Sequence, residues 1–508
     1  MSSPFDPPWV TVVTGRAQLE HFLSSEVERQ AAGALELRLD LWDLGSTIER
    51  QTLTALKVHL AQWTRPVIFT WRCTSELPVP HSPLRNELFQ EIARGGWGSA
   101  WVDLDLNAPS DREALRFLVG SRRVIASRHA SEALTDARAR EHLDRGFESG
   151  AAAVKLVLAE NGLSSVRQAL RVAVADHALH HRPICVLASG LEGAASRTLT
   201  TVGRYGWAYG RLQGCPGVDP GQPATARLAE RIGSSSECVP RSGFAVLGAR
   251  VERSISPSFH NGLLRSLGRP ELFLDLSLAT PDGVLAPDSD FEFLGLAVTT
   301  PHKHWARSVA DPGIPSCERY PAWNTLLRSH ASGRWLGWNT DAPAIRDLLE
   351  QRGLEVGERV LVLGAGGVAI PAAIELRDAG FDPRIVARTV ARARRVETEH
   401  ALSAAVDVIP DGVAIVNATG VDDPQIPGLQ KLRRSGAVRM ALEARYLPNE
   451  TVFLEQWRAS GAAPIHGVEV FAEQARRQAE ILYGYQGDRA QCMARAHQAL
   501  TAELQDER

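Results

Sequence analysis

The chain contains 52 arginines but only four lysines: Lys57, Lys155, Lys303 and Lys431. An arginine keeps its proton, whereas an amine can lose one and then add to a carbonyl carbon or relay a proton. In a sequence that uses arginine for most of its positive charge, each lysine is therefore a candidate for chemistry. Because a solvated lysine also occurs by chance, the surrounding sequence must decide between the two interpretations.

Lys155 lies in one of eight short β-rich runs, which alternate with amphipathic segments up to about residue 229. Alternating strands and helices form parallel sheets, and eight such units predict a closed (β/α)8 TIM barrel. A doubly wound open sheet is the alternative. The runs cover residues 9–15, 34–42, 66–73, 101–106, 123–130, 152–158, 183–190 and 207–212.

Several of these runs carry charges at positions that face one side. Glu36, Arg38 and Asp40 alternate along the run 34–42, so their side chains point the same way. Charges inside a barrel are costly unless they pair with one another or take part in chemistry, and strand ends converge on the mouth where active sites lie. The two interpretations are a buried structural ion-pair network and an active site.

Arg72 and His129 lie at the ends of two other runs, and Arg197 follows the seventh. Arginines crowded around Lys155 would disfavour its ammonium form and make the amine a nucleophile. His129 could then move protons near neutral pH.

The segments ELRLD, TWRCTSE, ASRH, VKLVL, GLEGAASR and PGQ, in this order over residues 9–230, resemble type I 3-dehydroquinate dehydratases. The resemblance implies that Lys155 forms a Schiff base with the substrate ketone, that His129 moves the proton, and that Glu76 orients His129. It also implies substrate contacts from Glu36, Arg38, Arg72, Arg197 and Gln222. Val218 departs from the family, which has serine there.

A second unit begins after a polar linker at residues 231–242. In the segment 358–380 a strand runs into Gly364, Ala365, Gly366 and Gly367 and then into an apolar helical stretch. Such a turn allows a pyrophosphate to approach a helix N-terminus. Arg388 follows the next strand and favours a 2′-phosphate, hence NADP, with Arg392 assisting. A Rossmann-like domain without a cofactor is the alternative.

Lys303 and Asp341 lie in the segments AVTTPHK and WNTDAP. A carboxylate beside a lysine can form a proton-transfer pair. For either residue taken alone, a surface salt bridge is the favoured interpretation.

The order of SISPSFHN, VTTPHK, AWNT, GWNTD, GAGG, ART, VNATG, EARYLP and VEVFAEQA over about 243–485 resembles shikimate dehydrogenases. The resemblance implies reversible hydride transfer between NADPH and 3-dehydroshikimate, with proton transfer by Lys303 and Asp341. Departures from the family occur at Arg253, Ala297, Ala342, Pro343 and Ala387. The implied substrate contacts are Ser254, Ser256, Thr299, Asn324, Asn339, Tyr446 and Gln474. The implied NADP contacts are the turn 364–367, Arg388, Thr389, Arg392, Asn417, Ala418, Thr419 and Gly467.

These observations predict a barrel at 1–230, a substrate-binding domain at 243–345 completed by helices at about 470–508, and a Rossmann domain at 346–469. The fusion resembles bifunctional dehydratase–dehydrogenase enzymes, in which the product of the first reaction is the substrate of the second. The resemblance implies conversion of 3-dehydroquinate to shikimate. Two alternatives remain: a quinate dehydrogenase specificity in the second half, and a metabolite-sensing pseudoenzyme.

Composition narrows the class of protein. The net charge of −3 offers no basic face for nucleic acid. The longest uncharged apolar run, 360–374, is short of the roughly 20 residues that span a bilayer, and the first residues do not resemble a signal peptide. Six cysteines without a CxxC pair predict a reduced cytoplasmic protein without a metal site.

Overall fold

The computed structural model describes residues 3–42, 50–72, 83–118, 123–232, 241–405, 409, 411–426 and 428–506. Its first part is a nearly closed parallel barrel in the order β7-β6-β5-β4-β3-β2-β1-β8, so the TIM-barrel prediction is confirmed. The eight strands are β1 (Trp9–Val13), β2 (Ala34–Arg38), β3 (Val67–Thr70), β4 (Trp101–Asp105), β5 (Val124–His129), β6 (Ala153–Leu158), β7 (Ile184–Ala188) and β8 (Ala208–Arg211).

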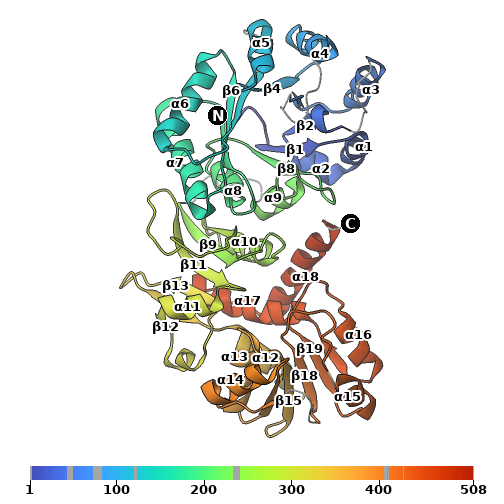
Figure 1. Cartoon of the computed structure of the whole chain (residues 1–508), viewed down its shortest axis with the longest axis vertical. Coiled ribbons are helices and arrows are strands. Elements are labelled where there is room, and N and C mark those ends of the chain that lie inside the picture. The colour runs from blue at the N-terminus through green and yellow to red at the C-terminus, as the bar shows by residue number, and fades with distance from the viewer. Residues whose placement is uncertain are drawn as a thin grey trace.

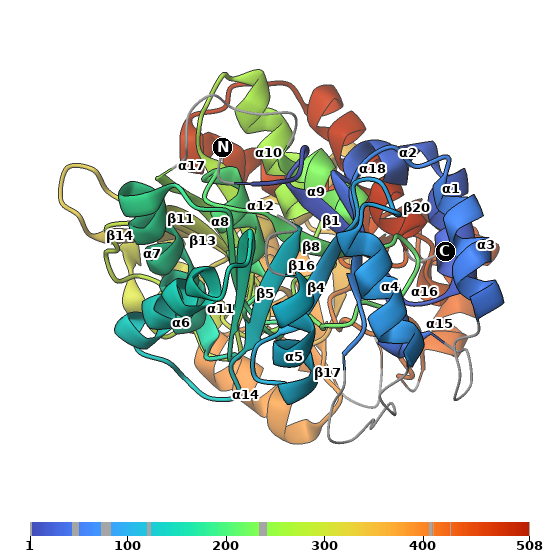
Figure 2. The same cartoon turned by 90° about the horizontal axis from the view of Figure 1, so that it is seen from above.

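Helices surround these strands, as the view from above shows (Figure 2). Apolar residues such as Leu35 and Leu37 on β2 pack outward beneath the helices, while Glu36 and Arg38 point inward, as period-two alternation requires. The helices are α1 (Arg16–Ser24), α2 (Glu26–Ala31), α3 (Arg50–Leu60), α4 (Pro83–Ala93), α5 (Pro109–Leu118), α6 (Asp136–Glu148), α7 (Gly162–His180), α8 (Ala195–Val202) and α9 (Thr225–Ile232).

A mixed sheet in the order β10-β9-β11-β13-β14-β12 follows the barrel. The predicted linker includes 233–240, which lie outside the described residues. The strands are β9 (Ser242–Gly248), β10 (Leu272–Ser277), β11 (Glu292–Val298), β12 (Asp311–Pro312), β13 (Thr325–Arg328) and β14 (Trp335–Trp338). With them come α10 (Ser256–Ser266), α11 (Lys303–Val309) and α12 (Asp341–Gln351).

The third sheet is parallel, in the order β17-β16-β15-β18-β19-β20, with helices between its strands. Its strands are β15 (Arg359–Leu363), β16 (Asp382–Val386), β17 (Ala404–Ala405), β18 (Ala414–Asn417), β19 (Met440–Glu443) and β20 (Ala463–Ile465). Its helices are α13 (Ala369–Asp378), α14 (Val390–His400), α15 (Leu429–Ser435) and α16 (Val452–Ala459). This is the Rossmann-type arrangement that the glycine-rich turn predicts.

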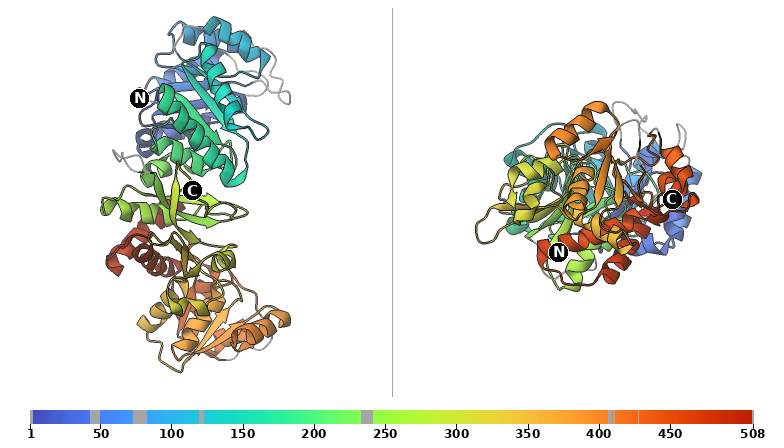
Figure 3. Two further views of the ribbon diagram at one scale, coloured as in Figure 1. Left: turned by 90° about the vertical axis from the view of Figure 1, so that its left-hand side faces the viewer. Right: turned by 90° about the horizontal axis from the view of Figure 1, so that it is seen from below.

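The last two helices return to the earlier parts of the chain. Apolar residues of α17 (Gly467–Tyr483) and α18 (Arg489–Gln505) share one core cluster with β9, β10 and α10. The barrel lies at one end of the molecule, the mixed sheet in the middle and the Rossmann sheet at the other end, and α18 reaches back to the barrel (Figures 1 and 3). Among the described residues, no helix combines the length and apolarity needed to cross a membrane.

Candidate active sites

The amine of Lys155 is buried inside the barrel among acidic groups. It donates to Oδ2 of Asp103 over 3.0 Å and lies 3.9 Å from Oε1 of Glu36. The ring of Tyr209 lies against it, with 4.0 Å between Nζ and the ring centroid. The direct partner of the amine is thus a carboxylate rather than one of the arginines that the sequence led us to expect around it, because strand register brings β4 and β6 side chains to the same level.

Asp103 is a member of this site that sequence reasoning missed. Burial works against its charge, but Lys155 and Arg72 outweigh burial and lower its pKa to about 2. The carboxylate therefore stays anionic across the physiological range and is a weak base. The available signal was strand alternation: Asp103 falls at an inward position of β4, as Glu36 does on β2.

His129 faces the same interior. Its Nδ1 and Nε2 lie 3.2 and 2.9 Å from two guanidinium nitrogens of Arg72. Burial, followed by the positive charges of Arg72 and Lys155, lowers its pKa to about 3. The imidazole is consequently neutral near pH 7 and able to accept a proton. Glu76, expected to orient it, lies outside the described residues.

Arg38 and Glu36 complete the inner wall on β2. Arg38 makes a two-pronged ion pair with Asp40, at 3.0 and 2.7 Å. Oε1 of Glu36 accepts a hydrogen bond of 2.6 Å from the hydroxyl of Thr70. Both predicted substrate contacts are therefore held by buried or half-buried partners before any substrate binds.

Arg197 and Gln222 belong to a second cluster, at the loop that precedes α9. Arg197 pairs with Asp219 at 3.0 Å, and Asp219 also accepts from the backbone N–H of Gly190. Oε1 of Gln222 accepts from the N–H of Val218 at 2.8 Å. A substrate carboxylate at Arg197 would have to share this guanidinium with Asp219.

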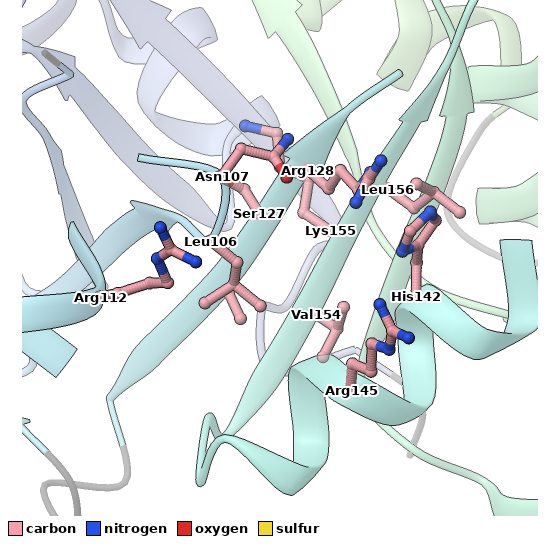
Figure 4. Close-up of a pocket in the computed structure, with 11 residues that line it drawn as sticks. Leu106, Asn107, Arg112, Ser127, Arg128, His142, Arg145, Val154, Lys155 and Leu156 are labelled. Carbon is pink, nitrogen blue, oxygen red and sulfur yellow. The ribbon is translucent and has the colours of Figure 1, made fainter. Parts of the chain in front are cut away.

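A cavity of about 260 Å³ opens on the outer wall of the barrel beside β5 and β6 (Figure 4). Arg112 lies on α5, and His142 and Arg145 lie on α6. Arg128 and Ala126 line it from β5, where Ala126 belongs to the apolar layer beneath the helices. Lys155 on β6 and Ser127 on β5 also line this cavity.

In the second half, the structure brings Lys303 and Asp341 together. Nζ of Lys303 donates to Oδ2 of Asp341 over 2.6 Å. Each is the first residue of its helix, α11 and α12, and both side chains are largely buried. The contact joins segments 38 residues apart. This geometry favours the proton-transfer interpretation over a solvated surface pair.

Beside this pair, Asn324 and Gln474 are hydrogen-bonded to Thr340, and Asn339 is hydrogen-bonded to the backbone on either side. Asn324 donates to the hydroxyl of Thr340 at 2.9 Å and accepts from its N–H at 2.8 Å. Gln474 of α17 accepts from the same hydroxyl at 3.3 Å. Asn339 donates to the carbonyl of Ala322 and accepts from the N–H of Ala342, the second residue of α12. These hydrogen bonds hold the backbone on both sides of Asp341 and so fix where its side chain starts.

Ser254, Ser256 and Tyr446 gather at the start of α10. Oγ of Ser254 accepts from the N–H of Ser256 at 3.2 Å, and the side chains of Ser254 and Tyr446 are hydrogen-bonded. The Tyr446 ring packs edge-on against Phe471, one turn before Gln474 on α17. Thr299 is half-buried at the end of β11. Helix α17 therefore contacts both groups of residues: Phe471 packs against Tyr446, and Gln474 is hydrogen-bonded to Thr340, next to Asp341.

The glycine-rich turn suits a dinucleotide. Gly364 has φ +111°, and a Cβ there would come within 3.1 Å of the carbonyl oxygen of Ala418. A Cβ on Gly367 would lie 3.4 Å from the side chain of Lys303, whereas Gly366 has open space around it. The turn thus approaches the Lys303–Asp341 pair closely, and its free side is open.

The positions predicted to bind the 2′-phosphate are exposed. Arg388 and Arg392 make no ion pair with any residue that the structure describes, and β16 ends without an acidic residue. Two guanidinium groups and no carboxylate fit a 2′-phosphate better than a free ribose hydroxyl. Thr389 caps α14 by accepting from the N–H of Arg392.

Two other predicted cofactor positions have visible structural roles. Asn417 donates to Glu443 at 2.7 Å and accepts from the hydroxyl of Thr419, so it holds the loop after β18. Burial raises the pKa of Glu443 to about 7. A Cβ on Gly467 would lie 2.1 Å from the carbonyl oxygen of Arg445, so the start of α17 requires glycine. Their contacts with a cofactor stay predictions.

Comparison with known proteins assigns both halves. Residues 10–236 match the family model of type I 3-dehydroquinase. A shikimate dehydrogenase (NADP⁺) of Natronomonas pharaonis is 32% identical over 253 residues, which are 47% of this chain and 93% of that protein. The chain belongs to the shikimate dehydrogenase family. Ahead of that unit it carries a type I 3-dehydroquinase domain.

Other relatives include proteins with both units. The chloroplastic bifunctional 3-dehydroquinate dehydratase/shikimate dehydrogenase of Arabidopsis thaliana is 26% identical over 425 residues, covering 76% of this chain and 68% of that protein. Among solved structures, the shikimate 5-dehydrogenase of Thermus thermophilus in complex with NADP(H) and shikimate shares 30% identity. It covers 50% of this chain and 98% of that chain with a TM-score of 0.43.

Proposed function

We propose that this chain is a bifunctional enzyme that dehydrates 3-dehydroquinate and then reduces the product to shikimate with NADPH. The observation that carries the proposal is the presence of two buried amines, each in its own half and each 3.0 Å or less from a carboxylate oxygen. The product of the first reaction is the substrate of the second, so one chain serves consecutive steps.

In the barrel, Lys155 would add to the substrate ketone and form an iminium with loss of water. The iminium withdraws electrons and acidifies the neighbouring C–H. His129 is neutral and would take this proton, while Asp103 stays the carboxylate partner of the Lys155 nitrogen. His129 then returns a proton to the departing hydroxyl, which leaves as water, and hydrolysis of the imine frees Lys155. Glu76 would orient the imidazole.

The remaining polar residues of the barrel would hold the substrate. Glu36, Arg38 and Arg72 line the interior and would contact its hydroxyls and ring. Arg197 and Gln222 belong to one loop cluster and would bind the carboxylate side, which requires Asp219 to release or share its partner.

In the dehydrogenase half, bound NADPH supplies the hydride. Lys303 would donate a proton to the carbonyl oxygen, and Asp341 would hold the ammonium group in position. Ser254, Ser256 and Tyr446 would bind the substrate carboxylate. Thr299, Asn324, Asn339 and Gln474 would hold its ring hydroxyls. The turn 364–367, Arg388 and Arg392 would hold the dinucleotide, with Thr389, Asn417, Ala418, Thr419 and Gly467 around it.

We place the domain boundaries at 230, 242, 345 and 469, with the C-terminal helices returning to the substrate-binding sheet. A cytoplasmic location is supported by four free thiols, Cys185, Cys215, Cys317 and Cys492. Quinate in place of shikimate is the competing substrate for the second half, since it carries the same carboxylate and ring hydroxyls and differs by one molecule of water added across the ring double bond.

A coupled assay tests the proposal. Purified protein with 3-dehydroquinate and NADPH should oxidise NADPH only after the enone product appears, and should prefer shikimate to quinate in the reverse direction. Lys303→Met should slow reduction about 10²- to 10⁴-fold, the usual weight of a general acid, and leave dehydration unchanged. Failure of the wild-type protein to turn over either substrate would overturn the assignment and favour a metabolite-sensing role.

A further inference from the structure

One arginine of the barrel reaches into the substrate-binding part of the dehydrogenase. Arg227 lies on α9, and its Nη2 donates to the backbone carbonyl of Ser254 over 3.1 Å. Its side chain is only 10% exposed, and its Nη1 is paired with Glu503 near the end of α18. Three segments far apart in sequence therefore meet at a single guanidinium group.

Glu503 connects this arginine to the residue beside Ser254. It pairs with Arg253 as well, at 3.3 Å, and its own side chain is 3% exposed. Arg253 is one of the positions at which this chain departs from the family pattern. The loop before α10 is thus fixed at its backbone by Arg227 and at its side chain by Glu503.

The same cluster lies within electrostatic range of Tyr446. Burial raises the pKa of Tyr446, and among the charged groups Glu503 raises it and Arg227 lowers it. Tyr446 is also hydrogen-bonded to the side chain of Ser254. Arg227 is therefore close to two of the three residues that we assign to the substrate carboxylate, Ser254 and Tyr446, without lying among the reacting atoms.

We propose that Arg227, a residue of the dehydratase barrel, is a positioning residue for the dehydrogenase: it holds the Ser254 loop so that its hydroxyls face the substrate carboxylate. The inference rests on the proposed function of the second half. A guanidinium offers a planar set of donors and can serve the Ser254 carbonyl and the Glu503 carboxylate at once. A loop held this way has less freedom to lose when the substrate binds.

Arg211 offers a matched control. It forms a two-pronged ion pair with Asp506 of the same C-terminal segment, at 2.8 and 2.5 Å, and has no recorded contact with the Ser254 loop among the described residues. Arg211→Met removes the ion pair with Asp506, and Arg227→Met removes the ion pair with Glu503 together with a longer contact of 3.9 Å with Asp506. Both variants therefore weaken the attachment of the barrel to the segment at the end of α18. A purely structural role predicts the same outcome for both variants.

The experiment is steady-state shikimate oxidation at saturating NADP⁺. Arg227→Met should raise the KM for shikimate roughly tenfold, the size of one hydrogen bond to a charged group, and change kcat less than about twofold. Arg211→Met should leave that KM unchanged while lowering the unfolding temperature similarly. Shikimate methyl ester, which lacks the charge, should show no difference between Arg227→Met and the wild type.

Two further variants keep the inference falsifiable if Arg227→Met folds poorly. Arg227→Lys retains the charge near Glu503 but not the planar fork, so it should restore the unfolding temperature and only part of the KM. In a Ser254→Ala background, Arg227→Met should add little to the KM. Equal KM values in wild type, Arg227→Met and Arg211→Met, with shikimate still oxidised, would overturn this inference alone; no oxidation by the wild type would overturn the proposed function instead.

Discussion

The buried amines of Lys155 and Lys303 lie in contrasting surroundings. Lys155 projects from β6 into the barrel, where the same sheet supplies Asp103, Glu36 and His129. Lys303 is the first residue of α11, has Asp341 as its partner, and lies near the glycine-rich turn, where a Cβ on Gly367 would come within 3.4 Å of its side chain. The first site is lined by charges on several sides, whereas the second is open toward the turn.

The difference follows from where the reactive group originates. In the barrel, under the proposed mechanism, the protein's own amine would form the covalent intermediate, so every group can be built into one rigid sheet. In the dehydrogenase a bound dinucleotide supplies the hydride, so the site must leave room beside the amine and place its substrate on a different sheet. The glycines of the turn 364–367 and the exposed Arg388 would provide that room and that recognition.

The sharpest test of this contrast is Lys155→Met. Dehydration should fall at least about 10³-fold, because no other described amine faces Asp103, while shikimate oxidation should stay within about twofold. Borohydride with 3-dehydroquinate should add mass to wild-type protein at Lys155 and not to the variant, as peptide mass spectrometry would report. Lys57→Met is the control, since Lys57 is half-exposed on α3. An adduct at Lys57, or undiminished dehydration, would reject the Schiff base.

An intermediate effect is expected at the exposed cofactor side. Arg388→Ser should raise the KM for NADP⁺ about 10- to 100-fold and leave that for NAD⁺ nearly unchanged, because only NADP⁺ carries the phosphate that a guanidinium would bind. Initial rates of shikimate oxidation with each nucleotide measure this. Arg395→Ser, on the exposed face of α14 and paired with Glu399, should change neither KM. A parallel loss for both nucleotides would mean that Arg388 has a structural role instead.

The smallest effect concerns the pH dependence of dehydration. A base works in its neutral form, so activity is lost as pH falls through its pKa. With a His129 pKa of about 3, kcat/KM should fall less than about twofold between pH 7.5 and 5.5, whereas an imidazole at 6.5 would lose about tenfold. Arg72→Met removes a positive charge, so it should raise the pKa of His129 and the pH at which activity is lost on the acid side, toward 6.5. Loss of activity near pH 6.5 in both the wild type and Arg72→Met would show that the barrel does not lower the pKa of His129.

Much of the fold was predictable because it depends on local periodicity. All eight β-rich runs of the first half contain a barrel strand, since alternation of apolar and polar residues reports which side of a strand is buried. The turn 364–367 likewise appeared between its strand and helix. Lys155 and Lys303 were singled out by their rarity and by the segments around them.

The partners of these residues were harder to predict. Asp103 was overlooked on a strand whose alternation was visible, because its value depends on meeting Lys155 across 52 residues. Arg197 was expected to contact the substrate, yet its guanidinium group is already paired with Asp219. Glu503 and Arg227 lie in amphipathic helices that carry no motif, so nothing local distinguished them from solvated charges.

The sequence by itself determined the two kinds of chemistry, because a proton-losing amine beside short recurrent segments restricts what each half can do. Only the tertiary structure decided which carboxylate holds each amine and that a barrel arginine supports the loop of the other half. Such contacts depend on strand register and on how α18 packs against α9 and α10, which arise from the sum of many weak contacts across the whole chain rather than from any one segment.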